Sequence, residues 1–142
     1  MKVKFKKLNP NAETPCKAHT ADAGFDLSAT SCTTDEFGNV VYGTGIAVEI
    51  PDGHVGLVFP RSSICKHNLL LTNSVGVIDS NYRGEITAKF TATAGNTLPD
   101  LYTFGDRIAQ LIIIPYPDIE FDEVSELSET DRGTGGYGST GK

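Results

Sequence analysis

A glycine-rich run near the C-terminal end of the sequence carries groups that can bind phosphate. In residues 132–141, glycines alternate with Arg132, Tyr137 and the hydroxyl side chains of Ser139 and Thr140. Glycine lets backbone N–H groups converge on phosphate oxygens, the arginine and hydroxyls add donors, and the tyrosine ring offers a stacking face. A frayed terminus or a linker has a similar composition. The arginine and the tyrosine set among the glycines favour a ligand-binding arm.

A second candidate anion site lies at residues 59–63, where Arg61, Ser62 and Ser63 precede a short predicted helix. The N-terminus of a helix carries partial positive charge, so an arginine and hydroxyls at that point suit an anionic ligand. The same serines could instead be simple helix caps.

Residues 73–84 form an apolar, hairpin-like segment that contains Asp79, with Tyr82 three residues later. An aspartate that follows Val77 and Ile78 is expected to be partly buried, where its pKa can rise and it can act as a general base. The alternative is a turn aspartate that accepts hydrogen bonds from its own backbone.

Two further segments contain polar residues beside predicted strands. Residues 23–27 contain Asp26, and residues 105–111 contain Gln110. Taken alone, these segments are typical of a strand entry and of a turn that leads into a strand. The three histidines lack metal-ligand spacing and are interpreted as surface or structural residues.

Short β-rich stretches between turn signals must position these groups. They lie at residues 3–5, 40–50, 55–59, 86–93 and 108–115, and the intervening turns at 35–39, 51–53, 94–96 and 104–106 are rich in Gly, Asp and Asn. One short helix is expected, capped by Ser62 or Ser63 and ended by Asn68 in the left-handed conformation. The pattern predicts an all-β sandwich or barrel.

The chain of 142 residues is long enough for one domain with its own core. We predict a β core at residues 1–119, followed by an extended segment and glycine-rich arm at 120–142, where apolar content is too low for independent folding. Three cysteines without CxxC spacing predict neither a disulfide framework nor a zinc site.

The net charge of −6 argues against binding to a nucleic-acid backbone, which requires a basic face. The sequence has no apolar stretch long enough for a membrane span and no signal-peptide pattern. We therefore expect a soluble cytoplasmic protein whose anionic ligand is small and is bound by local arginines, backbone amides and a divalent cation.

Taken together, and in their order along the chain, the five segments closely resemble the five motifs of the trimeric dUTP diphosphatase (dUTPase) family. These segments lie at residues 23–27, 59–63, 73–84, 105–111 and 132–141. The resemblance implies a β-barrel-like jelly roll with one short helix and a flexible C-terminal arm. It also implies a homotrimer with three active sites, each built from all three chains. One subunit would supply the segments around Asp26, Arg61 and Gln110, a second the segment around Asp79, and a third the arm.

The resemblance also implies residue roles. Asp79 would be the general base that activates a water for attack on the α-phosphorus of dUTP, giving dUMP and pyrophosphate. Asp26 and Gln110 would order the water and metal network, and Mg²⁺ would be held mainly by the three phosphates, with Asp26 reaching it through water. The residues that would bind the phosphates in the body of the protein are Arg61, Ser62 and Ser63.

The same resemblance implies how the nucleoside would be recognised. Asn73 and the backbone of Gly76, Val77 and Ile78 would read the uracil edge, and Tyr82 would pack on the deoxyribose, where a ribose 2′-hydroxyl would clash. In the arm, Arg132 would reach the γ-phosphate and Tyr137 would stack over the uracil. The phosphates would be wrapped by Gly138, Ser139 and Thr140.

Three positions depart from the commonest family pattern: Ser63 replaces a usual glycine, Asn81 a usual acidic residue, and Tyr137 a common phenylalanine. Arg-Ser-Ser also occurs in the related dCTP deaminases, which share the fold. Those enzymes need an acidic base and a further arginine where this sequence has Lys89 and Lys66, and this difference favours the diphosphatase. A nucleotide-sensing protein that binds dUTP without turnover is a second alternative.

Overall fold

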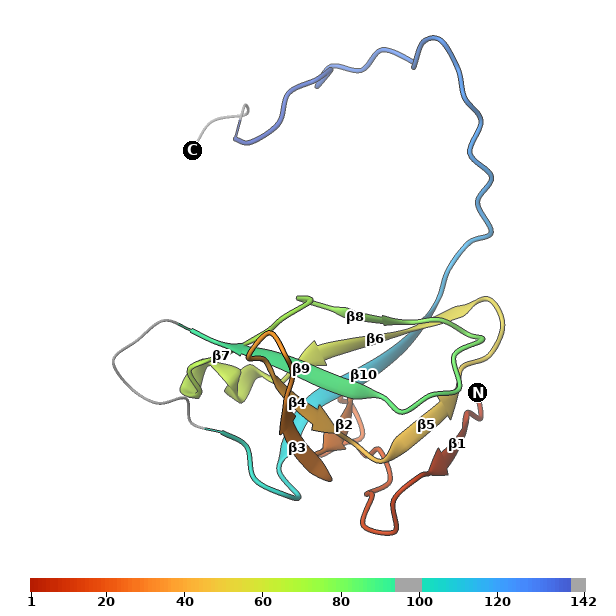
Figure 1. Cartoon of the computed structure of the whole chain (residues 1–142). Coiled ribbons are helices and arrows are strands. Elements are labelled where there is room, and N and C mark those ends of the chain that lie inside the picture. Colours follow the sequence, from red (N-terminus) through yellow and green to blue (C-terminus); the bar gives the residue numbers. More distant parts are fainter. Residues whose placement is uncertain (94–100, 139–142) are drawn as a thin grey trace.

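The computed structural model describes residues 1–93 and 101–138, which form antiparallel strands in two four-stranded sheets and one two-stranded ladder (Figure 1). In chain order the elements are β1 (Lys4–Lys7), β2 (Phe25–Ser28), β3 (Ser31–Thr34), β4 (Val40–Gly43), β5 (Ile46–Glu49), β6 (His54–Pro60), the 3-10 helix η1 (Ser62–Lys66), β7 (Leu69–Leu71), β8 (Gly76–Ile78), β9 (Thr87–Ala92) and β10 (Arg107–Pro115). The prediction of an all-β protein is confirmed.

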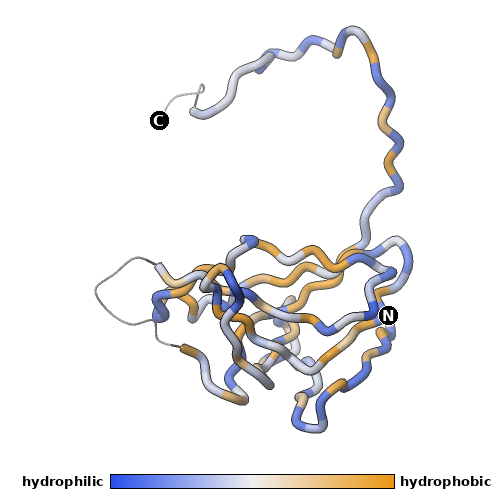
Figure 2. Tube along the Cα trace, viewed as in Figure 1, coloured by the Kyte–Doolittle hydropathy of each residue, from blue (hydrophilic) through white to orange (hydrophobic). Residues whose placement is uncertain are grey.

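One sheet has the strand order β2-β10-β6-β8 and the other β3-β4-β9-β7, while β1 pairs with β5. In β9 the side chains alternate, so that Ala88 and Phe90 are buried and Lys89 is exposed, as expected for a sheet with one face on the core. Figure 2 shows hydrophobic residues concentrated along the strands of the body. The largest fully buried side chains include Tyr42 and Phe90, whose rings meet edge to face with centroids 5.8 Å apart.

Each of the five predicted β-rich stretches overlaps at least one strand of the structure. The stretch 40–50 is divided into β4 and β5 near Gly45, whose φ of 66° favours glycine. The predicted turns at 35–39, 51–53 and 104–106 are confirmed, with Gly38, Gly53 and Gly105 at positive φ. The turn predicted at 94–96 lies outside the described residues.

The prediction for the short helix is wrong in its ends. The helix η1 is of the 3-10 type, begins after Arg61, and has no side-chain hydrogen bond at its N-cap. His67 ends it with φ −109° and ψ 145°, an extended conformation, and Asn68 is not left-handed. In this short 3-10 turn the first hydrogen bond runs from the N–H of Ile64 to the carbonyl of Arg61.

After β10 the chain runs away from the sheets as a long extended segment, drawn in blue in Figure 1. Its apolar side chains face solvent, and Phe121 and Leu127 are 95% and 87% exposed. No helix formed by the described residues is long and apolar enough to cross a membrane. The boundary between residues 119 and 120 stays a prediction, since only the end of β10 at Pro115 is fixed by pairing.

Candidate active site

A cluster of two arginines and one carboxylate lies where β2, β6 and β10 meet. The Nε of Arg61 donates to Oδ1 of Asp26 at 2.8 Å, and Nη1 of Arg107 donates to Oδ2 of the same carboxylate at 2.9 Å. The Asp26 side chain is only 12% exposed, Arg61 is 25% exposed and Arg107 is 45% exposed. The cluster thus keeps a net charge of +1, open to solvent on the arginine side.

Sheet register explains this meeting. On the central strand β10, Gln110 lies opposite Asp26 of β2 on one side and opposite Phe59 of β6 on the other. Residues paired across an antiparallel ladder point to the same face, so Gln110 and Asp26 share a face. Arg61 follows directly after the end of β6, within reach of the same carboxylate.

The side chain of Gln110 is itself held in place. Its Nε2 donates to the carbonyl of Pro60 at 3.1 Å. The neighbouring Gly24 leaves the space that this side chain occupies, since a Cβ at position 24 would lie 3.1 Å from the Cβ of Gln110 and would overlap its amide oxygen. Gly24 therefore helps to fix Gln110 beside the arginine cluster.

Arg107 was missed by the sequence analysis, although it lies within the segment 105–111. Sequence alone gives no sign that the first residue of β10 reaches Asp26, because a bulge between Arg107 and Ala109 sets its direction. An arginine offers five N–H donors, and one bond to Asp26 leaves others for a second anion. The cluster can therefore bind an oxyanion with both guanidinium groups.

Ser62 and Ser63 lie at the start of η1, next to Arg61. Ser62 is exposed, and its backbone carbonyl accepts a hydrogen bond from the thiol of Cys65 at 2.6 Å. Ser63 is half-buried. Both serines thus lie next to Arg61, and the prediction that their hydroxyls bind phosphate stays a prediction.

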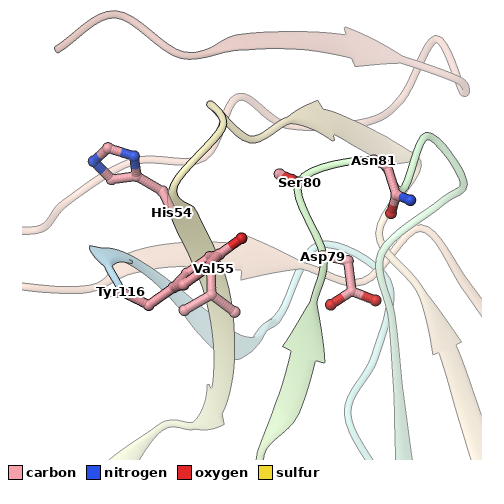
Figure 3. A pocket seen from close by; sticks show the side chains of 6 residues that line it. All are labelled: His54, Val55, Asp79, Ser80, Asn81 and Tyr116. Carbon is pink, nitrogen blue, oxygen red and sulfur yellow. The ribbon is translucent and has the colours of Figure 1, made fainter. Parts of the chain in front are cut away.

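Asp79 lies at a different place, after the last residue of β8. Figure 3 shows Asp79, Ser80 and Asn81 on one side of an open cavity of about 450 Å³, and His54, Val55 and Tyr116 on the other. Asp79 also borders a smaller recess of about 160 Å³ that contains Tyr82. The carboxylate is therefore available to ligands from two directions.

The expectation that Asp79 is partly buried is wrong for the single chain, in which this residue is exposed. The reason is that β8 is the edge strand of its sheet, so Val77 is also 63% exposed. An apolar run such as Val77 and Ile78 does not distinguish an edge strand from a central one.

The segment before β8 turns sharply. Ser74 adopts φ 62°, and the N–H of Val75 donates to the carbonyl of Asn73 at 2.6 Å. Asn73 is exposed, with its Nδ2 3.6 Å from the position of a Cβ at Gly76. Asn73 and the backbone of β8 therefore border one edge of the sheet.

The arm residues that the structure describes lie in the extended segment. Arg132 Nε donates to the carbonyl of Gly135 at 2.9 Å, and Tyr137 is fully exposed with φ 50°. Gly138 has φ 87°. Ser139 and Thr140, which were also predicted to bind phosphate, lie outside the described residues.

The sequence profile of the dUTPase family matches residues 10–141. The deoxyuridine 5'-triphosphate nucleotidohydrolase of Rhodococcus erythropolis is 43% identical over 143 residues, covering 99% of this chain and 87% of that protein. The enzyme of the same name from Corynebacterium glutamicum is 44% identical over 142 residues, covering 99% and 95%.

Solved structures agree with these relatives. A dUTPase mutant of Staphylococcus bacteriophage 80alpha, solved with dUpNHpp, superposes with a TM-score of 0.80 at 28% identity and covers 99% of each chain. A mutant dUTPase from phage phi11 of S. aureus, described with a structural Mg(II) ion, has a TM-score of 0.75 at 27% identity, covering 89% of this chain and 98% of that one. The family model and the solved structures thus match this all-β chain over most of its length. The chain belongs to the dUTPase family.

Proposed function

We propose that this dUTPase hydrolyses dUTP to dUMP and pyrophosphate in sites shared between subunits, with Asp79 as general base. The reaction is assigned from membership of the dUTPase family. The observation that carries the site is the pairing of both Asp26 oxygens with Arg61 and Arg107, which fixes two guanidinium groups beside each other. A triphosphate is the part of dUTP that matches two fixed guanidinium groups.

The arginine cluster would bind and orient the phosphates, with Ser62 and Ser63 as further donors. Preorganised donors lower the barrier because they match the charge of the transition state without rearrangement. Gln110, fixed by its bond to Pro60, would orient water at the same face of the sheet. Asp79 would then take a proton from the water that attacks the α-phosphorus.

The donor set fits a magnesium ion bound chiefly by the substrate. Mg²⁺ keeps several waters and prefers carboxylate and phosphate oxygens. Each Asp26 oxygen accepts one hydrogen bond from an arginine and has a second lone pair for a metal-bound water. The ion would supply charge neutralisation of the triphosphate, and Asp26 would hold it through water.

The separation of Asp79 from Arg61 supports sites formed by more than one chain. Ile78 pairs with Gly56, so the antiparallel register places Asp79 near Val55 at the start of β6, whereas Arg61 follows the end of β6. Six residues of strand therefore separate the two groups, about 20 Å at about 3.3 Å per residue. The base and the phosphate site of one chain are too far apart to act on one α-phosphorus, and we propose a homotrimer in which neighbouring chains bring them together.

The nucleoside would lie along the edge of the sheet at β8. Asn73 and the backbone of Gly76–Ile78 would bind the uracil, and Tyr82 would pack on the deoxyribose. The arm of a third chain would close the site, with Arg132 on the γ-phosphate, Tyr137 on the uracil, and Gly138, Ser139 and Thr140 around the phosphates. The extended course of the segment after β10 supports this assignment, because it can reach a neighbouring chain (Figure 1).

The decisive experiment incubates purified protein with dUTP, dCTP, dTTP and UTP, with Mg²⁺ or with EDTA, and follows pyrophosphate and ammonia separately. We expect Mg²⁺-dependent pyrophosphate release from dUTP alone. Ammonia from dCTP would instead indicate a deaminase, and dUTP binding without turnover would indicate a sensor. Light scattering on the same sample should give the mass of three chains.

A further inference from the structure

The ring of Tyr82 is placed by its neighbours in the loop that follows Asp79. Its phenolic O–H donates to the carbonyl of Glu85 at 3.0 Å, and its backbone N–H donates to the carbonyl of Asp79 at 3.1 Å. The ring borders the recess that is also lined by Val77, Ile78 and Asp79. Tyr82 is 44% exposed, so packing alone does not hold it there.

Gly84 provides the surface on which this ring lies. A Cβ at position 84 would lie 2.5 Å from Cζ and 2.9 Å from Cε2 of Tyr82, and would overlap its phenolic oxygen. The backbone of Gly84 is not in the left-handed region, unlike that of Gly38 or Gly53. Glycine is therefore required at position 84 by the space that the ring occupies and not by backbone conformation.

The backbone around Gly84 is fixed on both sides. Nη1 of Arg83 donates to the carbonyl of Ser80 at 2.6 Å and to that of Tyr82 at 2.9 Å. Oε1 of Glu85 accepts the N–H of Gly45 at 2.7 Å. Because these bonds hold the loop, a side chain at position 84 would displace the tyrosine ring and not the backbone.

We propose that Gly84 is a specificity-determining positioning residue, which sets the position of the Tyr82 ring in the recess and thereby the exclusion of a ribose 2′-hydroxyl. This inference rests on the proposed packing of Tyr82 against the deoxyribose and adds the residues that fix the ring. A steric wall excludes one oxygen atom only if it cannot retreat by about the radius of that atom. The bond to Glu85 prevents that retreat, and a Cβ at position 84 would overlap the phenolic oxygen that makes this bond and so release the ring.

The test compares kcat/KM for dUTP and for UTP in the wild type and in Gly84→Ala. We expect the dUTP to UTP ratio to fall by about tenfold or more in the variant, in the range that one hydroxyl contributes in a tight pocket. The alanine clashes only with the far end of a rotatable side chain, so the melting temperature should change little. An unchanged or higher ratio would overturn the proposal.

A double variant shows whether the effect passes through the ring. With the ring removed in Tyr82→Ala, adding Gly84→Ala should leave the ratio as it is, and a second tenfold fall there would contradict the proposal. The control Gly38→Ala strains an exposed turn at φ 81° with no atom within 4 Å of the new Cβ, and should lower stability without changing the ratio. The preference for dUTP over UTP can also be measured without turnover, as the ratio of the dissociation constants of their non-hydrolysable imido analogues. This measurement tests the role of Gly84 separately from the proposed hydrolysis.

Discussion

The two oxygens of the Asp26 carboxylate are each engaged by a different arginine, Arg61 Nε at 2.8 Å and Arg107 Nη1 at 2.9 Å. These residues come from three strands or strand ends that are far apart in the sequence, and β10 brings them together by pairing with both β2 and β6. The Asp26 carboxylate therefore restrains the rotamers of two flexible cations.

Arg107→Gln should reduce kcat/KM for dUTP by about tenfold to a hundredfold, because one of two phosphate donors is lost and Arg61 is less restrained. The effect should be mainly in KM, measured by initial rates over a range of dUTP concentrations. Lys4→Gln is the matched control, since it removes an exposed ion pair to Glu49 at 3.0 Å far from the cluster. Equal losses in both variants would show that the cluster has no special role.

Much of this architecture could be predicted from the sequence. Where the prediction failed, the failure has a physical cause. The strands β6, β9 and β10 were found because their apolar side chains repeat along the strand. The strand β3 was missed because all of its residues are exposed, so Ser31–Thr34 carries no apolar signal. Its formation depends on pairing with β4, which is not a local property.

The residues of the candidate site were likewise predicted only in part. The residues Asp26, Arg61 and Gln110 were found from their motifs, and the structure brings them together. Arg107 and Gly84 were missed because their roles depend on contacts across a sheet and across a turn. The burial of Asp79 was wrong because sequence does not show which strand forms the edge of a sheet.

Asp79→Asn should abolish turnover and leave dUTP binding nearly intact. The amide keeps the shape of the side chain but cannot take a proton from water, so kcat should fall by at least about 10²-fold to 10⁴-fold. Single-turnover rates and calorimetric binding of a non-hydrolysable dUTP analogue measure the two effects separately. Unaltered turnover would remove Asp79 from the role of base.

Deleting residues 132–142 should lower kcat/KM sharply without changing the melting temperature or the mass of the assembly. The described residues of this segment lie outside every strand, and Arg132 bonds locally to the carbonyl of Gly135. Scanning calorimetry, light scattering and steady-state kinetics on the shortened chain check this together. A shortened chain with full activity would contradict the role of the arm.

Asp106→Ala should weaken the turn that leads into β10 and hence into Arg107. Hydrogen bonds from the backbone N–H of Thr103 at 2.6 Å and from its hydroxyl at 2.9 Å lower the pKa of Asp106 below its usual 3.8. A carboxylate with a lowered folded pKa stabilises the fold above its unfolded pKa, and this contribution is lost as pH falls through the folded value.

The wild type should therefore melt about 2–4 °C above Asp106→Ala near pH 7, and the gap should close below about pH 4. Melting curves of both proteins between pH 7 and pH 2.5 measure it. A gap that stays constant over this range would mean that the carboxylate charge is not what stabilises the turn.

Mixing two inactive variants should restore activity if each site takes Arg61 from one chain and Asp79 from another. Arg61→Ala lacks the phosphate donor and Asp79→Asn lacks the base, so each homotrimer should be inactive. When the two are co-expressed with distinct tags and purified as mixed assemblies, every trimer contains both chains, so about a third of the sites should have both groups intact.

The expected activity is therefore about a third of the wild-type rate per site, measured as pyrophosphate release from dUTP under saturating Mg²⁺. Mixing the folded homotrimers without exchange of chains is the control and should give no activity. The separation of about 20 Å between the two residues along β6 makes the result decisive. Inactive mixed assemblies, with their composition verified by mass, would show that one chain supplies both groups and that β6 must rearrange to bring them together.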